Sequence, residues 1–155
     1  MIHAERPRIL VADSVGVGKT IEAGLILREL QARNDDFESV LIICPKPLVA
    51  EHKWRSEMKR FDENFTELDG ALLREAINEC DKDGEGPVAL RKTILPYSLM
   101  TKELLTGKGR QKGLLDLEEP VHFDLVIIDE AHHIRHSNTG AYRVARYFTD
   151  NADAV

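Results

Sequence analysis

The sequence is poor in cysteine, because Cys44 and Cys80 are the only two in 155 residues. Two cysteines so far apart indicate neither a disulfide framework nor a zinc cluster, and they favour a reducing, cytoplasmic location. Long hydrophobic runs are also missing, since none approaches the ~20 residues of a membrane span. The residues at the start of the sequence do not have the pattern of a secretory signal. We therefore expect no membrane partner.

Positive charge is not in excess either. The formal net charge is −6 at pH 7, which argues against a protein coated with positive charge for nucleic acid. Binding of nucleic acid through one local face stays open. The length is sufficient for one domain with a buried core, and 43% hydrophobic and 31% charged residues are ordinary for a globular protein.

Continuous aliphatic runs predict the strands. They lie at residues 8–13, 40–45 and 124–130, and none alternates apolar with polar residues. Such runs are typical of strands buried on both faces of a parallel sheet. A fourth candidate strand lies at 93–98, where Pro96 indicates its end rather than its centre.

Helical periodicity lies between these runs, at residues 19–33, 47–61 and 140–148. Alternating strands and helices predict an α/β domain with right-handed crossovers. Glycine-rich stretches at 81–87 and 106–113 predict loops. The predicted apolar stripe of the first helix consists of Ile21, Leu25, Ile26 and Leu30. The predicted core residues of the second helix are Trp54, Met58 and Phe61.

Residues 10–24, LVADSVGVGKTIEAG, carry most of a phosphate-binding loop. The pattern G-x-x-x-x-G-K-S/T ends in Gly18, Lys19 and Thr20, but Asp13 occupies the position of its first glycine. The loop leaves a predicted strand and enters a predicted helix, an arrangement that presents backbone N–H groups to an anion. Lys19 would reach the β- and γ-phosphates of ATP, and the Thr20 hydroxyl would bind Mg²⁺. The candidate nucleotide-binding residues are Asp13, Ser14, Val15, Gly16, Val17, Gly18, Lys19, Thr20 and Ile21.

A pair of acids ends the run at 124–130. Asp129 and Glu130 would lie at the carboxyl edge of a parallel sheet, where open α/β sheets bind ligands. Asp129 is suited to hold Mg²⁺, usually through water, and Glu130 is suited to polarise an attacking water. Taken alone, the pair is also compatible with a solvated strand end or a helix N-cap. Together with the phosphate loop, it predicts a site for ATP and Mg²⁺.

Four segments in this order resemble the early motifs of superfamily-two helicases, and within them the Swi/Snf-like ATPases. The segments read ADSVGVGKTIEAGLI, VLIICPKPLVAEHKWRSEMKRF, TILPYSLM and DLVIIDEAHHIR. The resemblance is strongest to the bacterial, RNA-polymerase-recycling branch of these ATPases. Asp13 in the first-glycine position is normal in this group, so the loop resembles an intact one. Ser14 departs from the pattern, because relatives usually carry Glu there.

The resemblance implies a RecA-like P-loop NTPase fold, a three-layer α/β/α sandwich with a mainly parallel sheet. Residues 1–155 would form the N-terminal ATP-binding lobe, truncated before the third helicase motif and lacking the second RecA-like lobe. Lys19 and Glu130 would be catalytic, Thr20 and Asp129 would hold the metal, and His132 would couple the acidic box to the second lobe. Nucleic-acid contacts are implied for Pro45, Lys46, Tyr97 and Ser98. The implied partners are ATP, the second lobe in cis, and duplex DNA or RNA through the full-length protein.

Two other functions stay open at this point. The same loop serves small-molecule kinases, although the acidic box argues against one, and the fold could act as a nucleotide-gated binding module without turnover. Three weaker patterns in the sequence are better explained by solvated surface residues than by binding sites. These are a possible zinc cluster at His132, His133 and His136, an incomplete calcium loop from Asp81 with Lys92 in place of its last ligand, and a basic cluster of Lys108, Arg110 and Lys112.

Overall fold

A computed structural model describes residues 6–12, 18–83 and 90–155 of the protein. Its centre is a five-stranded sheet in the order β2-β3-β1-β4-β5, and each neighbouring pair is parallel. The main elements are α1 (Lys19–Arg33), β1 (Val40–Cys44), α2 (Lys46–Ala50), α3 (Lys53–Lys59), β2 (Thr66–Glu67), α4 (Gly70–Asp83), β3 (Lys92–Pro96), α5 (Lys102–Thr106), β4 (Phe123–Ile128), α6 (Gly140–Asp150) and β5 (Ala152–Ala154). Short 3-10 helices follow some of them, among them η2 (Tyr97–Leu99) and η4 (Ala131–Ile134).

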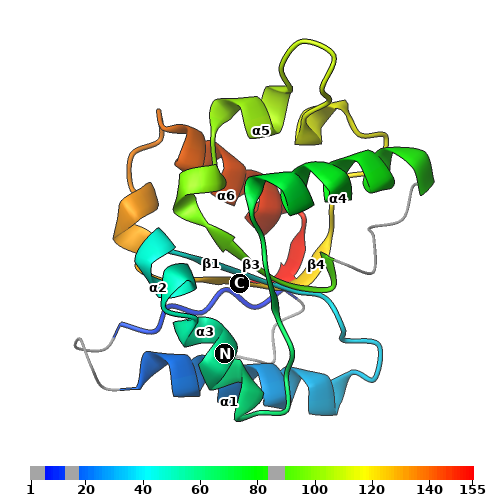
Figure 1. Ribbon diagram of the computed structural model, residues 1–155. Coiled ribbons are helices and arrows are strands. Elements are labelled where there is room, and N and C mark those ends of the chain that lie inside the picture. Colours follow the sequence, from blue (N-terminus) through cyan, green and yellow to red (C-terminus); the bar gives the residue numbers. More distant parts are fainter. Residues whose placement is uncertain (1–5, 13–17, 84–89) are drawn as a thin grey trace.

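The sheet is the middle of three layers (Figure 1). Helices α1, α2 and α3 cover one face, and α4, α5 and α6 cover the other. In β1, Leu41 and Ile43 pack toward α4–α6, whereas Val40, Ile42 and Cys44 pack toward α1 and α3. Both faces of the strand are therefore buried, which explains why its residues do not alternate with polar ones. The predicted α/β/α sandwich with a mainly parallel sheet is confirmed.

The prediction of a strand at 8–13 that is buried on both faces is wrong. Its described part, 8–12, is extended but is not a regular strand. It meets the sheet edge through two backbone hydrogen bonds, from the Ile9 N–H to the Val155 carbonyl at 2.7 Å and from the Val155 N–H to the Pro7 carbonyl at 2.9 Å. Leu10 is 82% exposed. Within the described residues, only these two backbone hydrogen bonds join the segment to the sheet, and its face that carries Leu10 is exposed to solvent. The described part of the aliphatic run therefore does not form a central strand.

The predicted helix at 47–61 is two helices. Helix α2 ends before His52, whose φ of 52° is left-handed, and α3 starts at the next residue. The left-handed residue turns the chain between the two helices. The predicted burial of Trp54 and Met58 is confirmed, and Phe61 is half-buried.

Helix α1 has the predicted bounds, but its predicted apolar stripe is only partly confirmed, because Ile26 and Leu30 are half-buried and the other two residues are exposed. Ile21 is 41% exposed and Leu25 is 58% exposed, whereas Gly24 and Leu27 are buried. Gly24 lies so close to the ring of Phe61 that a Cβ there would come within 2.3 Å of Phe61 Cε2. The helix therefore turns its Gly24 side toward α3, and this contact sets the face that is buried.

Other boundaries differ by a few residues. Pro96 ends β3, as predicted, and α6 runs two residues past the predicted 148. The predicted loop at 81–87 is wrong for its first three residues, because they belong to α4. The remainder of that loop lies outside the described residues. Thr106 is the last residue of α5 rather than the first of a loop.

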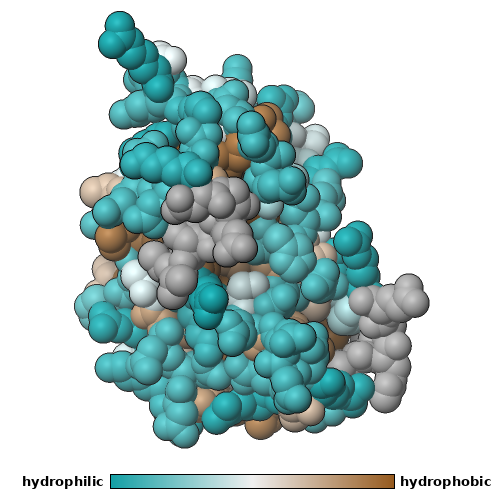
Figure 2. All heavy atoms as spheres, turned by 90° about the vertical axis from the view of Figure 1, so that its right-hand side faces the viewer, coloured by the Kyte–Doolittle hydropathy of each residue, from teal (hydrophilic) through white to brown (hydrophobic). Residues whose placement is uncertain are grey.

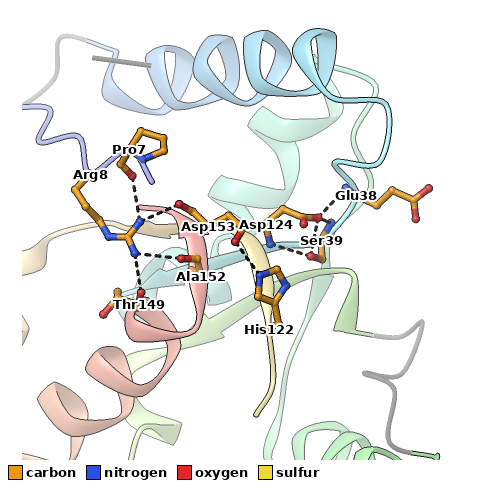
Figure 3. A network of polar contacts seen from close by, with 9 residues as sticks. All are labelled: Pro7, Arg8, Glu38, Ser39, His122, Asp124, Thr149, Ala152 and Asp153. Carbon is orange, nitrogen blue, oxygen red and sulfur yellow. Dashed lines mark hydrogen bonds and ion pairs between the residues drawn. The ribbon is translucent and has the colours of Figure 1, made fainter. Parts of the chain in front are cut away.

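A polar network joins the segment before α1 to the end of the chain (Figure 3). The guanidinium group of Arg8 donates hydrogen bonds to the backbone carbonyls of Pro7, Thr149, Ala152 and Asp153, at 3.0–3.2 Å. One side chain thus links the extended segment to the end of α6 and to β5.

A second part of the network joins the starts of β1 and β4 (Figure 3). One carboxylate oxygen of Asp124 accepts hydrogen bonds from the backbone N–H groups of Glu38 and Ser39 and from the Ser39 hydroxyl, at 2.6–2.9 Å. The Asp124 N–H donates back to the Ser39 hydroxyl at 2.9 Å. These bonds fix the register of the two central strands at the edge opposite the acid pair.

No helix within the described residues is long and apolar enough to cross a bilayer. Figure 2 shows one face of the molecule, which is mostly hydrophilic, with hydrophobic side chains in small separate areas.

Candidate functional site

The start of α1 presents the lysine of the predicted phosphate loop. Gly18 precedes the helix with a left-handed φ of 88°, and Lys19 and Thr20 are the first helical residues. The first N–H groups of a helix have no helical acceptor, and glycine has no side chain that could cap them. This terminus therefore suits an anion such as a phosphate. Residues 13–17 of the predicted loop, Asp13, Ser14, Val15, Gly16 and Val17, lie outside the described residues.

The acid pair follows β4 directly. The Asp129 N–H donates to the Ile43 carbonyl at 2.8 Å, so the parallel pairing with β1 continues to the acid itself. Glu130 has a left-handed φ of 54°, which ends the extended backbone at this residue. Both carboxylates lie at the carboxyl edge of the sheet, where the sequence predicts them.

One cavity of about 380 Å³ brings the two halves of the predicted site together. Lys19, Asp129, Glu130 and His132 all line it. Apolar side chains of α1 and β4 and the extended segment 9–11 form much of the remaining wall. Pro45, Lys46, Tyr97 and Ser98 are not among its described lining residues. The lysine and the acids thus line one cavity.

Asp129 is held by two side chains from other segments. The indole N–H of Trp54, on α3, donates to Asp129 Oδ2 at 2.8 Å. The Tyr97 hydroxyl, in η2, donates to the backbone carbonyl of Asp129 at 2.7 Å. The helical spacing predicts a core position for Trp54 but does not predict this bond. Nothing in the spacing signals it, because only the sheet order brings the two residues together.

The acids make this edge of the sheet electronegative. Burial raises the pKa of the Cys44 thiol to about 12, and the charges of Asp129 and Glu67 add to the effect. Burial also raises the pKa of Tyr97, with further contributions from Asp129, Cys44 and Glu130. Such a potential favours a cation. Mg²⁺ prefers oxygen donors, so the Asp129 carboxylate in the cavity wall fits this metal. Thr20 offers a hydroxyl beside Lys19 but is not among the described residues that line the cavity.

The residues for which nucleic-acid contacts are predicted lie at the same edge. Pro45 and Lys46 follow β1, and Tyr97 and Ser98 follow β3, its neighbour in the sheet. Lys46 and Ser98 are exposed, whereas Pro45 and Tyr97 are half-buried. Their roles stay predictions.

The histidines near the acid pair contact the site and one another. His132 Nδ1 lies 3.2 Å from Glu130 Oε2, and the rings of His132 and His133 are 4.5 Å apart. A different group meets the geometry of a metal site among the described residues: ligand atoms of His122, Asp124 and Asp153 lie within 4.8 Å of one another. These residues already bind protein partners, since His122 Nε2 lies 3.1 Å from Asp153 Oδ1 and Asp124 binds Ser39 (Figure 3).

A parallel sheet covered on both faces, with a lysine at a helix N-terminus and an acid pair around one cavity, is the arrangement expected of the ATP-binding lobe of a helicase-type ATPase. Comparison with known families agrees. The family described as "Type III restriction enzyme, res subunit" matches residues 1–152. The chain belongs to this helicase family, whose members normally use ATP with Mg²⁺.

Similar proteins include RNA polymerase-associated protein RapA from two bacteria. The protein from Haemophilus influenzae (strain PittEE) is 40% identical over 134 residues, which are 86% of this chain and 13% of that protein. The protein from Vibrio cholerae serotype O1 (strain M66-2) is 38% identical over 129 residues, 83% of this chain and 12% of that protein. The chain thus spans about an eighth of the length of these relatives.

A solved structure confirms the fold. The SWI2/SNF2 ATPase core from Sulfolobus solfataricus, in complex with dsDNA, matches with a TM-score of 0.63 and 16% sequence identity. The match covers 99% of this chain and 27% of that chain. The expected RecA-like fold is therefore confirmed. The family match and the RapA relatives, together with this structure, confirm the expected likeness to Swi/Snf-like ATPases.

Proposed function

We propose that the chain is the N-terminal RecA-like lobe of a cytoplasmic, nucleic-acid-dependent ATPase that moves along duplex DNA or remodels a complex bound to it. One observation carries the proposal: Lys19, Asp129 and Glu130 line a single cavity. The relatives support the choice of partner, because one is named for its association with RNA polymerase and the other is described with dsDNA. The experiment below distinguishes DNA from RNA as the partner.

Each residue of the cavity has a role suited to its chemistry. The N-terminus of α1, with residues 13–21 of the loop, would bind the phosphates, and Lys19 would neutralise charge that develops on the γ-phosphate. Thr20 and Asp129 would hold Mg²⁺, which neutralises phosphate charge when bound. Glu130 would accept a proton from the attacking water.

Turnover in this proposal requires a second RecA-like lobe. His132 is exposed and its ring contacts Glu130, so it can transmit a contact from that lobe to the catalytic acid. The second lobe would also supply an arginine finger, worth about 10³–10⁵-fold in rate. We therefore expect this chain alone to bind Mg²⁺-ATP weakly and to hydrolyse it barely. Lys46 and Ser98, exposed at the same edge, would contact the nucleic-acid backbone together with Pro45 and Tyr97.

The test is the ATPase activity of the intact protein with duplex DNA, single-stranded DNA and RNA added separately. Stimulation by duplex DNA is expected. Glu130→Gln should lower the stimulated rate by about 10²–10⁴-fold, because it removes the proton acceptor. Glu118→Gln, at an exposed acid outside the cavity, is the matched control and should retain the rate.

Two results would contradict the proposal. An intact protein that binds ATP but shows no turnover with any polymer would indicate a nucleotide-gated binding module. Transfer of the γ-phosphate to a small molecule in an acceptor screen would indicate a kinase.

A further inference from the structure

Asp129 is contacted by two donors that come from different parts of the chain. Trp54 lies on α3, after β1, and its N–H bonds one oxygen of the carboxylate at 2.8 Å. Tyr97 lies directly after β3, and its hydroxyl bonds the carbonyl of the same residue at 2.7 Å. Trp54 belongs to the hydrophobic cluster on the α1–α3 face of the sheet, whereas Tyr97 packs against the cluster on the α4–α6 face.

The position of Trp54 does not depend on a ligand. Its side chain is 4% exposed and packs in one hydrophobic cluster with Met58 and Phe65. An indole N–H can only donate, and a buried donor without an acceptor is costly. Packing therefore fixes the direction of the N–H, and the Asp129 carboxylate is its acceptor before any nucleotide binds.

Tyr97 holds the backbone rather than the carboxylate. Its ring is half-buried, and its centroid lies 5.4 Å from that of His133. A backbone carbonyl oxygen can only accept a hydrogen bond, so the Tyr97 hydroxyl is the donor to Asp129. Tyr97 thus restrains the backbone of Asp129, and Trp54 restrains its carboxylate. Together the two hydrogen bonds limit the orientations that the Asp129 side chain can adopt.

We infer that Trp54 and Tyr97 are positioning residues, which hold Asp129 in one orientation for the metal of Mg²⁺-ATP. The inference rests on the proposed role of Asp129. A carboxylate accepts more than one hydrogen bond, so the bond from Trp54 leaves acceptor positions for a metal or its water. Partners of this kind, which orient a metal ligand without touching the metal, typically change metal affinity by about 10–100-fold.

The measurement is the affinity of this chain for ATP by titration calorimetry, once with Mg²⁺ and once with EDTA. Trp54→Phe keeps a buried ring but removes the N–H. It should weaken binding of Mg²⁺-ATP about tenfold and leave binding of metal-free ATP unchanged. Tyr97→Phe removes only the hydroxyl and should show a smaller loss with the same dependence on Mg²⁺. If Trp54→Phe does not fold, as judged by thermal unfolding, Tyr97→Phe alone decides the test.

A matched variant controls for packing. Phe65→Leu removes a buried ring from the same cluster, and it should affect both affinities equally or not at all. Trp54 is also the only tryptophan in the 155 residues. Its fluorescence in the unmodified chain should change when Mg²⁺-ATP binds and change less with ATP in EDTA.

The variant Asp129→Asn separates this inference from the proposed function. If Asp129→Asn removes the effect of Mg²⁺, and Trp54→Phe added to it causes no further loss, both proposals stand. If Asp129→Asn removes the effect of Mg²⁺ but Trp54→Phe and Tyr97→Phe do not reduce it, the positioning role is wrong and the metal site stands. If Asp129→Asn retains the full effect of Mg²⁺, the proposed metal ligand is itself wrong.

Discussion

The contact between Gly24 of α1 and Phe61, which lies two residues after α3, can be tested by adding one methyl group, Gly24→Ala. In the interior of a helix, alanine is more stable than glycine by about 1 kcal/mol. Here the new Cβ would come within 2.3 Å of Phe61 Cε2, which is too close without movement of the ring or the helix. Overpacking of this kind typically costs about 1–3 kcal/mol. The steric term therefore exceeds the propensity term, and we expect a net loss of about 1 kcal/mol in the free energy of unfolding.

Urea unfolding of four chains measures this effect: the unmodified chain, Gly24→Ala, Phe61→Ala and the double variant. Once the ring of Phe61 is removed, the same methyl group should stabilise the chain by about 1 kcal/mol, since only helix propensity remains. The sign of the effect should thus reverse between the two backgrounds. Equal destabilisation by Gly24→Ala in both backgrounds would refute the reasoning that Phe61 sets the buried face of α1.

Three further predictions concern stability. Glu63 is buried and forms an ion pair with Lys92, so Glu63→Ala should lower the free energy of unfolding by about 3 kcal/mol. Glu38 forms an exposed ion pair with Arg91, so Glu38→Ala should lower it by less than about 1 kcal/mol. Arg8→Ala should accelerate amide hydrogen exchange at Ile9 and Val155, whose N–H groups join the segment to the sheet edge, without unfolding the sheet. Arg8→Lys should do so as well, because lysine cannot donate to four carbonyls from a planar fork. Burial and two nearby acids raise the pKa of Cys44 from 9.0 to about 12. The unfolded thiol ionises first, so stability should fall as the pH rises through this interval, and Cys44→Ala should show a smaller fall.

The elements that could be predicted from the sequence are those with a strong local signal. The run at 40–45 is buried on both faces, and a continuous aliphatic segment predicts that state directly. Pro96 ends β3 because proline lacks the N–H that the ladder needs. Asp129 and Glu130 reach the carboxyl edge because that edge follows from a parallel arrangement alone. The sequence thus predicts the edge of the sheet at which the acid pair lies.

The features that were missed depend on partners far away in the chain. The run at 8–13 has the composition of a central strand, but its described part, 8–12, lies beyond β5 at the edge of the sheet, where Leu10 is exposed. The left-handed turn at His52 has no glycine or proline to signal it. The bond between Trp54 and Asp129 requires the pairing of β1 with β4, which periodicity within one helix does not reveal.

The position of a bound triphosphate tests the central claim most directly. We propose a crystal structure of the chain with a non-hydrolysable ATP analogue and Mn²⁺, whose anomalous scattering locates the metal. We predict that Lys19 Nζ contacts the β- or γ-phosphate and that Asp129 binds the metal directly or through one water. Phosphates bound elsewhere, or a metal with no contact to Asp129 or its water, would contradict the account.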